Sequence, residues 1–396
     1  MSDNRKTWHL IATLGPTQIL TWGALYYAIA ILAPDIGREM GWRAEIVFGA
    51  FSWCLLFSGI VATPAGIWLD RYGGRYTMTA GSLLCGTGLI MLSQAHSIAL
   101  YYAAWTVLGA AMALTLYEAA FATIIRETPQ RARQSISTLT LFGGFASTIF
   151  WPLTLLLNTR LGWRDTYLYY GLIQLLLVLP LHALLPARPR DLTPHGVQHA
   201  GSHTLAQALR EPTFWKLAFA FAGNSFIFTA LSVHLITLLQ QFGHAVTWVV
   251  FVAAMIGPTQ VAGRVGEMMF GRRTRPQTVG MITFGALPAA LLALVLMGTE
   301  QWAVALFCLL YGLSNGIVTI VRGAIPQALF GSKNYGAISG AMSGPALILK
   351  AAAPLAVAAI VQRYPLPQVL LCGLLAVSVA SLSFYVSAIK APPPVL

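Results

Sequence analysis

Long apolar runs separated by short polar segments dominate the chain. A run of about 20 mostly apolar residues is long enough to cross a bilayer as a helix. Such runs fall at 8–33, 44–69, 76–94, 98–125, 134–157, 166–185, 214–239, 246–270, 278–297, 302–325, 336–361 and 367–388. The long polar stretch 186–213 divides them into two sets of six. The pattern therefore predicts an all-α membrane protein with twelve transmembrane helices. We expect six-helix bundles at 1–185 and 214–396, joined by a cytoplasmic linker at 186–213.

The composition excludes several soluble classes of protein. Of the 396 residues, 57% are hydrophobic and 9% are charged, against about 25% charged residues in a typical soluble domain. Lys and Arg number 24 and Asp and Glu 12, but the cations lie in short loops between apolar runs. We therefore expect a lipid bilayer as partner and no nucleic acid.

The loop cations predict the orientation. With the N-terminus inside, sixteen Lys and Arg residues fall on the cytoplasmic side and five on the opposite side. Cytoplasmic loops carry an excess of Lys and Arg, so both termini are expected in the cytoplasm. The compact loops and short termini favour a bacterial inner membrane.

The two halves also resemble each other. Gly41-Trp42 before the second span matches Thr247-Trp248 before the eighth, and Trp151-Pro152 in the fifth matches Ala353-Pro354 in the eleventh. The offset is about 200 residues in each case, which indicates a duplicated six-helix unit and pseudo-symmetric bundles.

A glycine-rich motif connects the second and third spans. It reads Gly66-Ile-Trp-Leu-Asp70-Arg71-Tyr-Gly73-Gly-Arg75. A tight glycine turn there would hold the aspartate near a helix end and present the arginines to neighbouring helices and lipid head groups. The motif resembles the G-xxx-D-R-x-G-R-[RK] signature of the major facilitator superfamily, with glycine in place of the first paired cation. The resemblance covers the whole chain and implies the major facilitator fold.

Further segments are similar to the monocarboxylate-transporter and oxalate:formate-antiporter group. They are Gly41-Trp42-Arg-Ala before the second span and Gly162-Trp163-Arg164 after the fifth. In that group an arginine in helix 8 and, in oxalate-transporting members, a lysine in helix 11 bind substrate carboxylates. The resemblance implies these roles for Arg264 and Lys350. The helix-1 signature of animal carriers is absent, so the substrate's identity does not transfer.

Five charged residues lie well inside predicted spans, away from the first turns. The cations Arg264, Arg322 and Lys350 outnumber the acids Glu118 and Glu267. A charge at the bilayer centre costs about 2.5–3.5 kcal/mol, and a bound anion would offset an excess cation. We therefore expect a small organic anion, a carboxylate, bound by Arg264 and Lys350. An ion pair between Arg264 and Glu267, one helical turn apart, is the structural alternative.

Glu118 and Arg322 occupy near-equivalent positions in the two halves, at similar depth. They are candidates for a salt bridge that closes a cytoplasmic gate, and Glu118 is alternatively a proton carrier. Glu267 belongs to the same gating or coupling group. Proton coupling and exchange both remain open as energy sources.

Several neutral residues are candidates to contact substrate. Gln18 and Asn224 lie near mid-depth in the first and seventh spans, and Tyr26, Tyr27 and His234 lie towards the outer ends of those spans. Interfacial anchoring is the alternative role for the tyrosines.

The motifs that a nucleotide-driven pump or an enzyme requires do not occur in the sequence. The chain has no GxxxxGK[ST] loop and no grouping of nucleophile, base and oxyanion donors. We therefore expect a monomeric secondary transporter working by alternating access, with no cofactor or metal. The alternatives are a proton-coupled exporter of hydrophobic compounds, a membrane receptor or scaffold, and an intramembrane enzyme.

Overall fold

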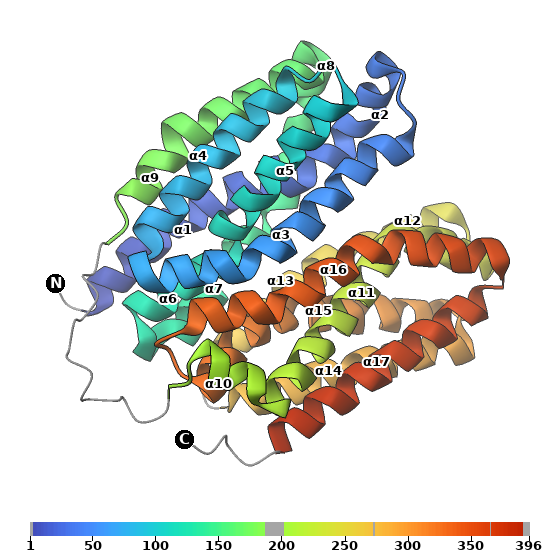
Figure 1. The fold of residues 1–396 in the computed structure, drawn as a ribbon. Helices are drawn as coiled ribbons and strands as arrows, with labels where there is room; N and C mark the ends of the chain where they lie inside the picture. Colours follow the sequence, from blue (N-terminus) through green and yellow to red (C-terminus); the bar gives the residue numbers. More distant parts are fainter. Residues whose placement is uncertain (1–2, 187–201, 272–273, 365, 391–396) are drawn as a thin grey trace. The chain divides into compact units, whose positions relative to one another are not determined.

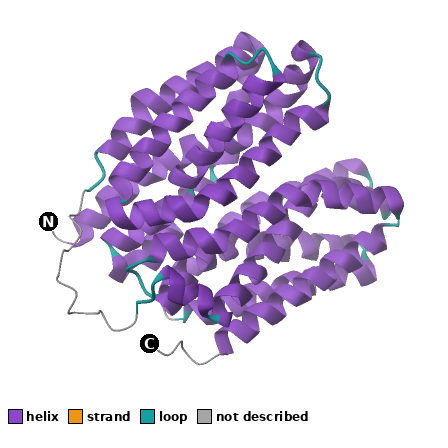
Figure 2. Ribbon diagram, in the orientation of Figure 1, coloured by secondary structure: helices purple, strands orange, loops and turns teal. Residues whose placement is uncertain are grey.

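The computed structural model describes residues 3–186, 202–271, 274–364 and 366–390. Within these ranges every regular element is a helix (Figures 1 and 2). Among the described residues, eleven stretches are long and apolar enough to cross a membrane, and one of them, Pro129–Ala183, is 55 residues long. That stretch has room for two crossings, and its helix is broken at Gly162, where φ is +82°. The predicted all-α membrane fold is confirmed, and the spans agree with the twelve predicted.

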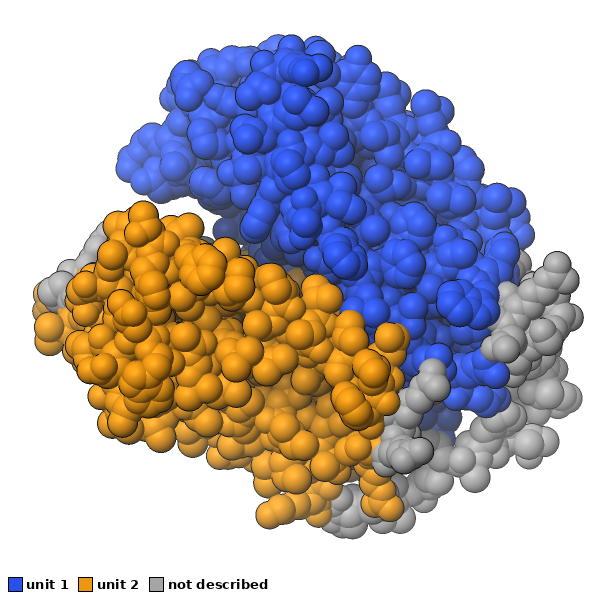
Figure 3. All heavy atoms as spheres, turned by 180° about the vertical axis from the view of Figure 1, so that it is seen from behind, with its two compact units in different colours: residues 1–205, 330–344 blue, residues 206–329, 345–396 orange. Residues whose placement is uncertain are grey.

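The chain folds as two compact units, coloured separately in Figure 3. Unit 1 comprises residues 1–205 and 330–344, and unit 2 comprises residues 206–329 and 345–396. The units share most of their residues with the predicted bundles, but residues 330–344, which include the first turns of the eleventh span, belong to unit 1. The predicted boundaries at 185 and 214 stay a prediction.

Unit 1 contains the first helices of the chain and the start of α16. Two of its spans carry a single turn of π-helix (η1 and η3). Its elements are α1 (Asp3–Trp22), η1 (Gly23–Tyr27), α2 (Ala28–Met40), α3 (Ala44–Tyr72), α4 (Gly74–Ser93), α5 (Ile98–Thr115), α6 (Tyr117–Glu127), η2 (Pro129–Arg131), α7 (Ala132–Gly144), α8 (Ala146–Ile173), η3 (Gln174–Val178) and α9 (Leu179–Ala183).

Unit 2 contains the later helices. The short α10 (Leu205–Arg210) precedes its first span. The others are α11 (Pro212–Gln241), α12 (Val246–Ala254), α13 (Ile256–Phe270), α14 (Pro276–Met297), α15 (Gln301–Phe330), α16 (Tyr335–Arg363) and α17 (Pro367–Lys390). Its core is largely aliphatic, and includes Leu231, Leu291 and Leu371.

Three spans expected to be continuous are interrupted. The predicted helix at 98–125 divides into α5 and α6 at Leu116, whose backbone is extended (φ −78°, ψ −164°). The spans at 134–157 and 246–270 divide at Phe145 and Met255. These breaks correct the sequence-based expectation of unbroken helices. Discontinuous helices often form the binding sites of transporters.

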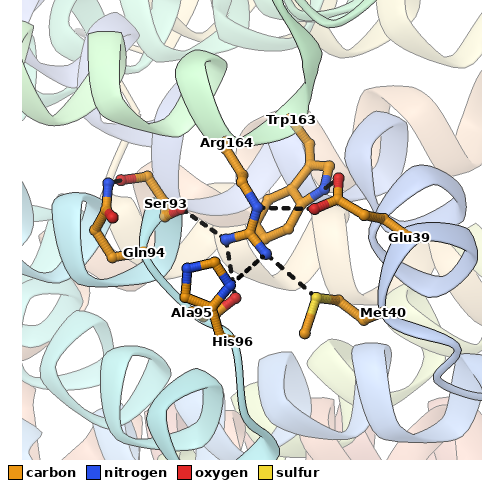
Figure 4. A network of polar contacts seen from close by, with 8 residues as sticks. All are labelled: Glu39, Met40, Ser93, Gln94, Ala95, His96, Trp163 and Arg164. Atoms are coloured by element: carbon orange, nitrogen blue, oxygen red, sulfur yellow. Dashed lines mark hydrogen bonds and ion pairs between the residues drawn. The ribbon is translucent and has the colours of Figure 1, made fainter.

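One network ties together three connections of unit 1 at the end predicted to face outward (Figure 4). Arg164 donates from Nε to Glu39 Oε1 at 2.8 Å, and Trp163 donates to the other oxygen of Glu39 at 2.6 Å. Arg164 Nη1 also donates to the carbonyls of Ser93 and Ala95, each at 2.9 Å. The guanidinium therefore joins the end of α2, the α4–α5 connection and the bend in α8.

Candidate functional site

The break between α5 and α6 lies beside Gln18 of α1. Because the backbone is extended at Leu116, the end of α5 presents carbonyls that need donors from outside the helix. Gln18 Nε2 donates to the carbonyl of Thr115 at 2.7 Å, and the glutamine is fully buried. The predicted substrate-contacting Gln18 is thus held at a helix break inside unit 1.

Aromatic side chains gather around this break. Trp22 lies 5.0 Å from Tyr117 and 5.3 Å from Tyr26, and Tyr27 lies 5.9 Å from Trp151, between ring centroids. Tyr26 and Tyr27 belong to the π-helical turn η1, and such turns are frequent at functional sites. We call this group the unit 1 aromatic cluster, which comprises Trp22, Tyr26, Tyr27, Phe51, Tyr117 and Trp151.

Two buried polar atoms of α1 have no hydrogen-bond partner among the described residues. They are the acceptor Gln18 Oε1 and the donor Trp22 Nε1. A buried polar group left unsatisfied costs about 1–3 kcal/mol. A ligand or water molecule beside the unit 1 aromatic cluster would remove that cost, so these atoms mark a candidate contact point.

Glu118 lies in the first turn of α6, directly after the break. Its carboxylate is half-buried, and Ser343 donates to its Oε1 at 3.4 Å. A helix N-terminus stabilises a carboxylate. The predicted salt bridge to Arg322 of unit 2 stays a prediction, as does the alternative role of Glu118 in carrying a proton.

Arg264 and Glu267 of α13 are both buried in unit 2, with 6% and 7% of their surfaces exposed. Glycines bring α13 close to α15 at this level. A Cβ on Gly263 would lie 2.8 Å from the carbonyl oxygen of Leu313, and one on Gly316 would lie 2.2 Å from that of Gln260. Small residues allow such close approach of transmembrane helices, and this packing helps to bury the two charges.

Lys350 and Arg322 are half-buried within spans of unit 2. Lys350 lies between Ala346 and Ala353 on α16, both fully buried. By helical rise it is about 22 Å from the first residue of α16. Its Cα is therefore far from the first residue of the span.

Asn224 and His234 of α11 differ in their surroundings. Asn224 lines a cavity with Tyr311 and Asn315, but its volume of about 10 Å³ has room for one water molecule at most. His234 is half-buried, and its Nε2 has no hydrogen-bond partner in the described part of the chain. Contact of either residue with substrate stays a prediction.

The loop motif holds the start of α16. The carboxylate of Asp70 accepts hydrogen bonds from the backbone amides of Gly336 at 2.9 Å and Ala337 at 2.7 Å. These amides lie in the first turn of α16, where a carboxylate is favoured by the helix dipole. Gly66 permits the approach, because a Cβ there would lie 2.0 Å from the carbonyl oxygen of Gly336.

The arginines around the motif divide between two roles. Arg126, at the end of α6, donates to the carbonyls of Leu69 and Asp70 at 3.2 and 2.6 Å. Arg71 is exposed, with its guanidinium 5.2 Å from the ring centroid of Tyr72. Arg75 is half-buried, and Gly73 adopts φ +87° at the turn.

The structure brings together residues that sequence reasoning missed. Trp22, Tyr117 and Trp151 complete the unit 1 aromatic cluster, and Arg126 joins the loop motif. Their positions give a weak signal at most. Tyr117 precedes the intramembrane Glu118, and Trp22 lies between the candidates Gln18 and Tyr26.

Relatives of known sequence are distant. The chain is 25% identical over 312 residues to the uncharacterized MFS-type transporter YhjX of Escherichia coli, covering 73% of this chain and 74% of YhjX. It is 26% identical over 164 residues to human monocarboxylate transporter 7, covering 39% of this chain and 30% of that protein.

Solved structures share the fold. The human organic anion transporter MFSD10 (TETRAN) aligns with a TM-score of 0.72 at 14% identity, over 97% of this chain and 100% of that chain. The Escherichia coli fucose:proton symporter FucP aligns with a TM-score of 0.75 at 14% identity, over 96% and 98%.

A sequence profile described as Major Facilitator Superfamily matches residues 14–346, most of the chain. This match agrees with the helical membrane fold and with the motif around Asp70. The chain therefore belongs to the major facilitator superfamily and is a secondary transporter rather than an enzyme.

Proposed function

We propose that this secondary transporter moves a small organic anion, a carboxylate, by alternating access. The observation that carries the proposal is the burial of Arg264 within a membrane span of unit 2. A guanidinium offers a planar fork of donors that matches the two oxygens of a carboxylate.

The charge balance of unit 2 supports an anionic substrate. Its span interiors carry the three cations Arg264, Arg322 and Lys350, against the single acid Glu267. A bound carboxylate would offset part of the positive excess. The name of monocarboxylate transporter 7 and the description of MFSD10 as an organic anion transporter point the same way.

Glu118 is the candidate group for energy coupling. It is half-buried at the helix break beside the unit 1 aromatic cluster. A carboxylate there can carry a proton with the substrate, or it can form the gating salt bridge with Arg322 expected from the sequence.

A second candidate function is export of hydrophobic compounds, with proton coupling. The unit 1 aromatic cluster favours it, because aromatic faces bind apolar and cationic molecules. FucP, which shares the fold, is a fucose:proton symporter. The charge of the transported compound separates the two candidates.

The first test is a thermal-shift screen of the purified protein in detergent. The panel holds mono- and dicarboxylates, amino acids, sugars and lipophilic cations. A ligand that binds the folded state raises the melting temperature by mass action. We expect a carboxylate to do so, and Lys350→Ala to abolish the shift.

The matched control is Lys333→Ala, which removes an exposed lysine outside the predicted spans and should keep the shift. Stabilisation by lipophilic cations alone, retained in Lys350→Ala, would contradict the anion proposal and favour the exporter. A carboxylate shift of equal size in Lys350→Ala would remove that residue from the site.

A further inference from the structure

A hollow outside the candidate site lies in unit 2, between the start of α11 and the end of α17. Its volume is about 730 Å³, and two lysines and two serines contribute to its lining. The lining residues are Lys216, Leu382, Ser383, Val386, Ser387 and Lys390. The transport proposal assigns no role to any of them.

The packing of α11 against α17 brings the two lysines to the same end of unit 2. Moving along α11, Phe219 lies 6.0 Å from Phe384 between ring centroids, and a Cβ on Gly223 would lie 2.2 Å from Ser381 Oγ. The partner residue number falls as the α11 number rises, so the helices are antiparallel. The start of α11 therefore meets the last turns of α17.

The polar groups of the hollow suit a phosphate. Within the described chain neither Lys216 nor Lys390 forms an ion pair with a carboxylate. Ser383 donates to the carbonyl of Val379 at 2.8 Å, whereas the Ser387 hydroxyl forms no hydrogen bond in the described structure. Two lysines and a serine hydroxyl thus line the same hollow.

The apolar surroundings suit acyl chains rather than a soluble anion. Val386 lies one turn and Leu382 two turns before Lys390, on the same face of α17. Phe219 and Phe384, on the same two helices, are 51% and 42% exposed. Trp215 is exposed next to Lys216 and donates its indole N–H to the carbonyl of Leu209 at 2.9 Å, in the manner of an interfacial anchor.

We propose that this hollow binds an anionic phospholipid. Lys216, Lys390 and Ser387 hold its phosphodiester, and its acyl chains lie along Leu382 and Val386. The loop cations predict that this end of the helices lies in the cytoplasmic leaflet, where anionic lipids attract basic residues and basic pockets between helices bind head groups. The site is independent of the transported substrate.

The test is a lipid titration of the purified full chain in neutral detergent, followed by the melting temperature. The probes are short-chain phosphatidylglycerol, short-chain phosphatidylcholine and inorganic phosphate. We expect a saturable rise with phosphatidylglycerol alone. Lys216→Ala with Lys390→Ala should weaken it about 30-fold, from about fivefold per lysine near an anionic surface.

Two control variants sharpen the result. Lys216→Arg with Lys390→Arg keeps the charge and should keep the rise in melting temperature. Lys333→Ala removes an exposed lysine elsewhere and should keep it too. If the double alanine variant does not fold, each single alanine variant should show about a fivefold loss.

Three outcomes would overturn the proposal. If folded alanine variants show the same rise in melting temperature with phosphatidylglycerol as the native protein, the two lysines do not bind the lipid. An equal response to phosphatidylcholine would reduce the hollow to an apolar groove, and an equal response to inorganic phosphate would make it a soluble-anion site.

Discussion

The two units bury polar side chains of different kinds. Among the described residues, the charged side chains that are fully buried, Arg264 and Glu267, both lie in unit 2. The polar side chains buried in the spans of unit 1 are uncharged residues such as Gln18, Thr17 and Ser82, together with the histidine His182. A satisfied neutral network costs little to bury, whereas a buried charge needs a partner or a ligand. The difference supports the proposal that the buried charges of unit 2 take part in binding the anion.

His182 illustrates the neutral case. Its Nε2 lies 3.0 Å from Thr17 Oγ1, and its Nδ1 lies 2.7 Å from Ser82 Oγ. Nδ1 also lies 3.2 Å from the carbonyl oxygen of Met78. The imidazole thereby links α1, α4 and α9.

The largest expected effect comes from removing a buried charge of unit 2. Arg264→Ala should lower carboxylate affinity by about 10- to 150-fold, since a hydrogen bond to a charged group contributes about 1.5–3 kcal/mol. Binding is measured by isothermal titration with a carboxylate found in the thermal screen. Arg264→Lys keeps the charge without the fork and should show an intermediate loss.

A second variant separates binding from folding. Arg264→Ala leaves Glu267 buried without the nearby cation, which is destabilising. Adding Glu267→Gln should recover the melting temperature but not the affinity. Native affinity in either variant would place the anion site elsewhere.

In the uncharged network of unit 1, His182→Ala should reduce stability and leave carboxylate binding intact. The change leaves a cavity and removes the hydrogen-bond partner of Thr17 and Ser82, at a cost of about 2–4 kcal/mol. Thermal unfolding measures the loss, and the carboxylate-induced shift should persist. His9→Ala, which removes an exposed histidine of α1, is the control and should change neither quantity. If a folded His182→Ala variant no longer binds the carboxylate, the neutral network of unit 1 is needed for binding and the contrast between the units is wrong.

The carboxylate of Asp70 holds the start of α16 in unit 1. At the equivalent position in the second half of the sequence the residue is Phe270, which has no charge. Asp70→Asn should accelerate hydrogen exchange at Gly336 and Ala337 about fivefold, since a carboxylate at a helix N-terminus contributes about 1 kcal/mol. Exchange followed by mass spectrometry resolves this segment. Peptides from the middle of α14 should be unaffected, and unchanged exchange at the start of α16 would show that the carboxylate does not stabilise it.

The sequence-based predictions agree with the structure on features that the thickness of the bilayer determines. They differ from it on features that side-chain packing determines. Spans were predictable because about 20 apolar residues are needed to cross a membrane. The break at Leu116 was not, since no proline or glycine marks it and the carbonyl of Thr115 accepts its hydrogen bond from Gln18, 97 residues away. The Asp70 motif was predictable as a motif, but its contact with α16 joins residues 266 positions apart. The unit 1 aromatic cluster depends on which helix faces meet, and no local pattern contains that information.

The smallest expected effect concerns the connections at the ends predicted to face outward. In unit 1 Arg164 reaches Glu39 and the carbonyls of Ser93 and Ala95, whereas in unit 2 His244 bonds the carbonyl of Gly298 at 2.7 Å. A lysine lacks the fork needed to reach all three groups of unit 1. Because Glu39 is half-exposed, Arg164→Lys should cost less than about 1 kcal/mol, which lowers the melting temperature by at most about 2–4 °C.

Arg38→Lys is the matched control for that loss. Arg38 pairs with Asp35 at 2.7 Å, but its side chain is 78% exposed, and such pairs contribute little. Arg38→Lys should therefore leave the melting temperature unchanged. If Arg164→Lys is equally silent, the carbonyl contacts do not hold the three connections of unit 1 together. The outer ends of the two units would then be alike in stability, and their difference would lie in the buried charges alone.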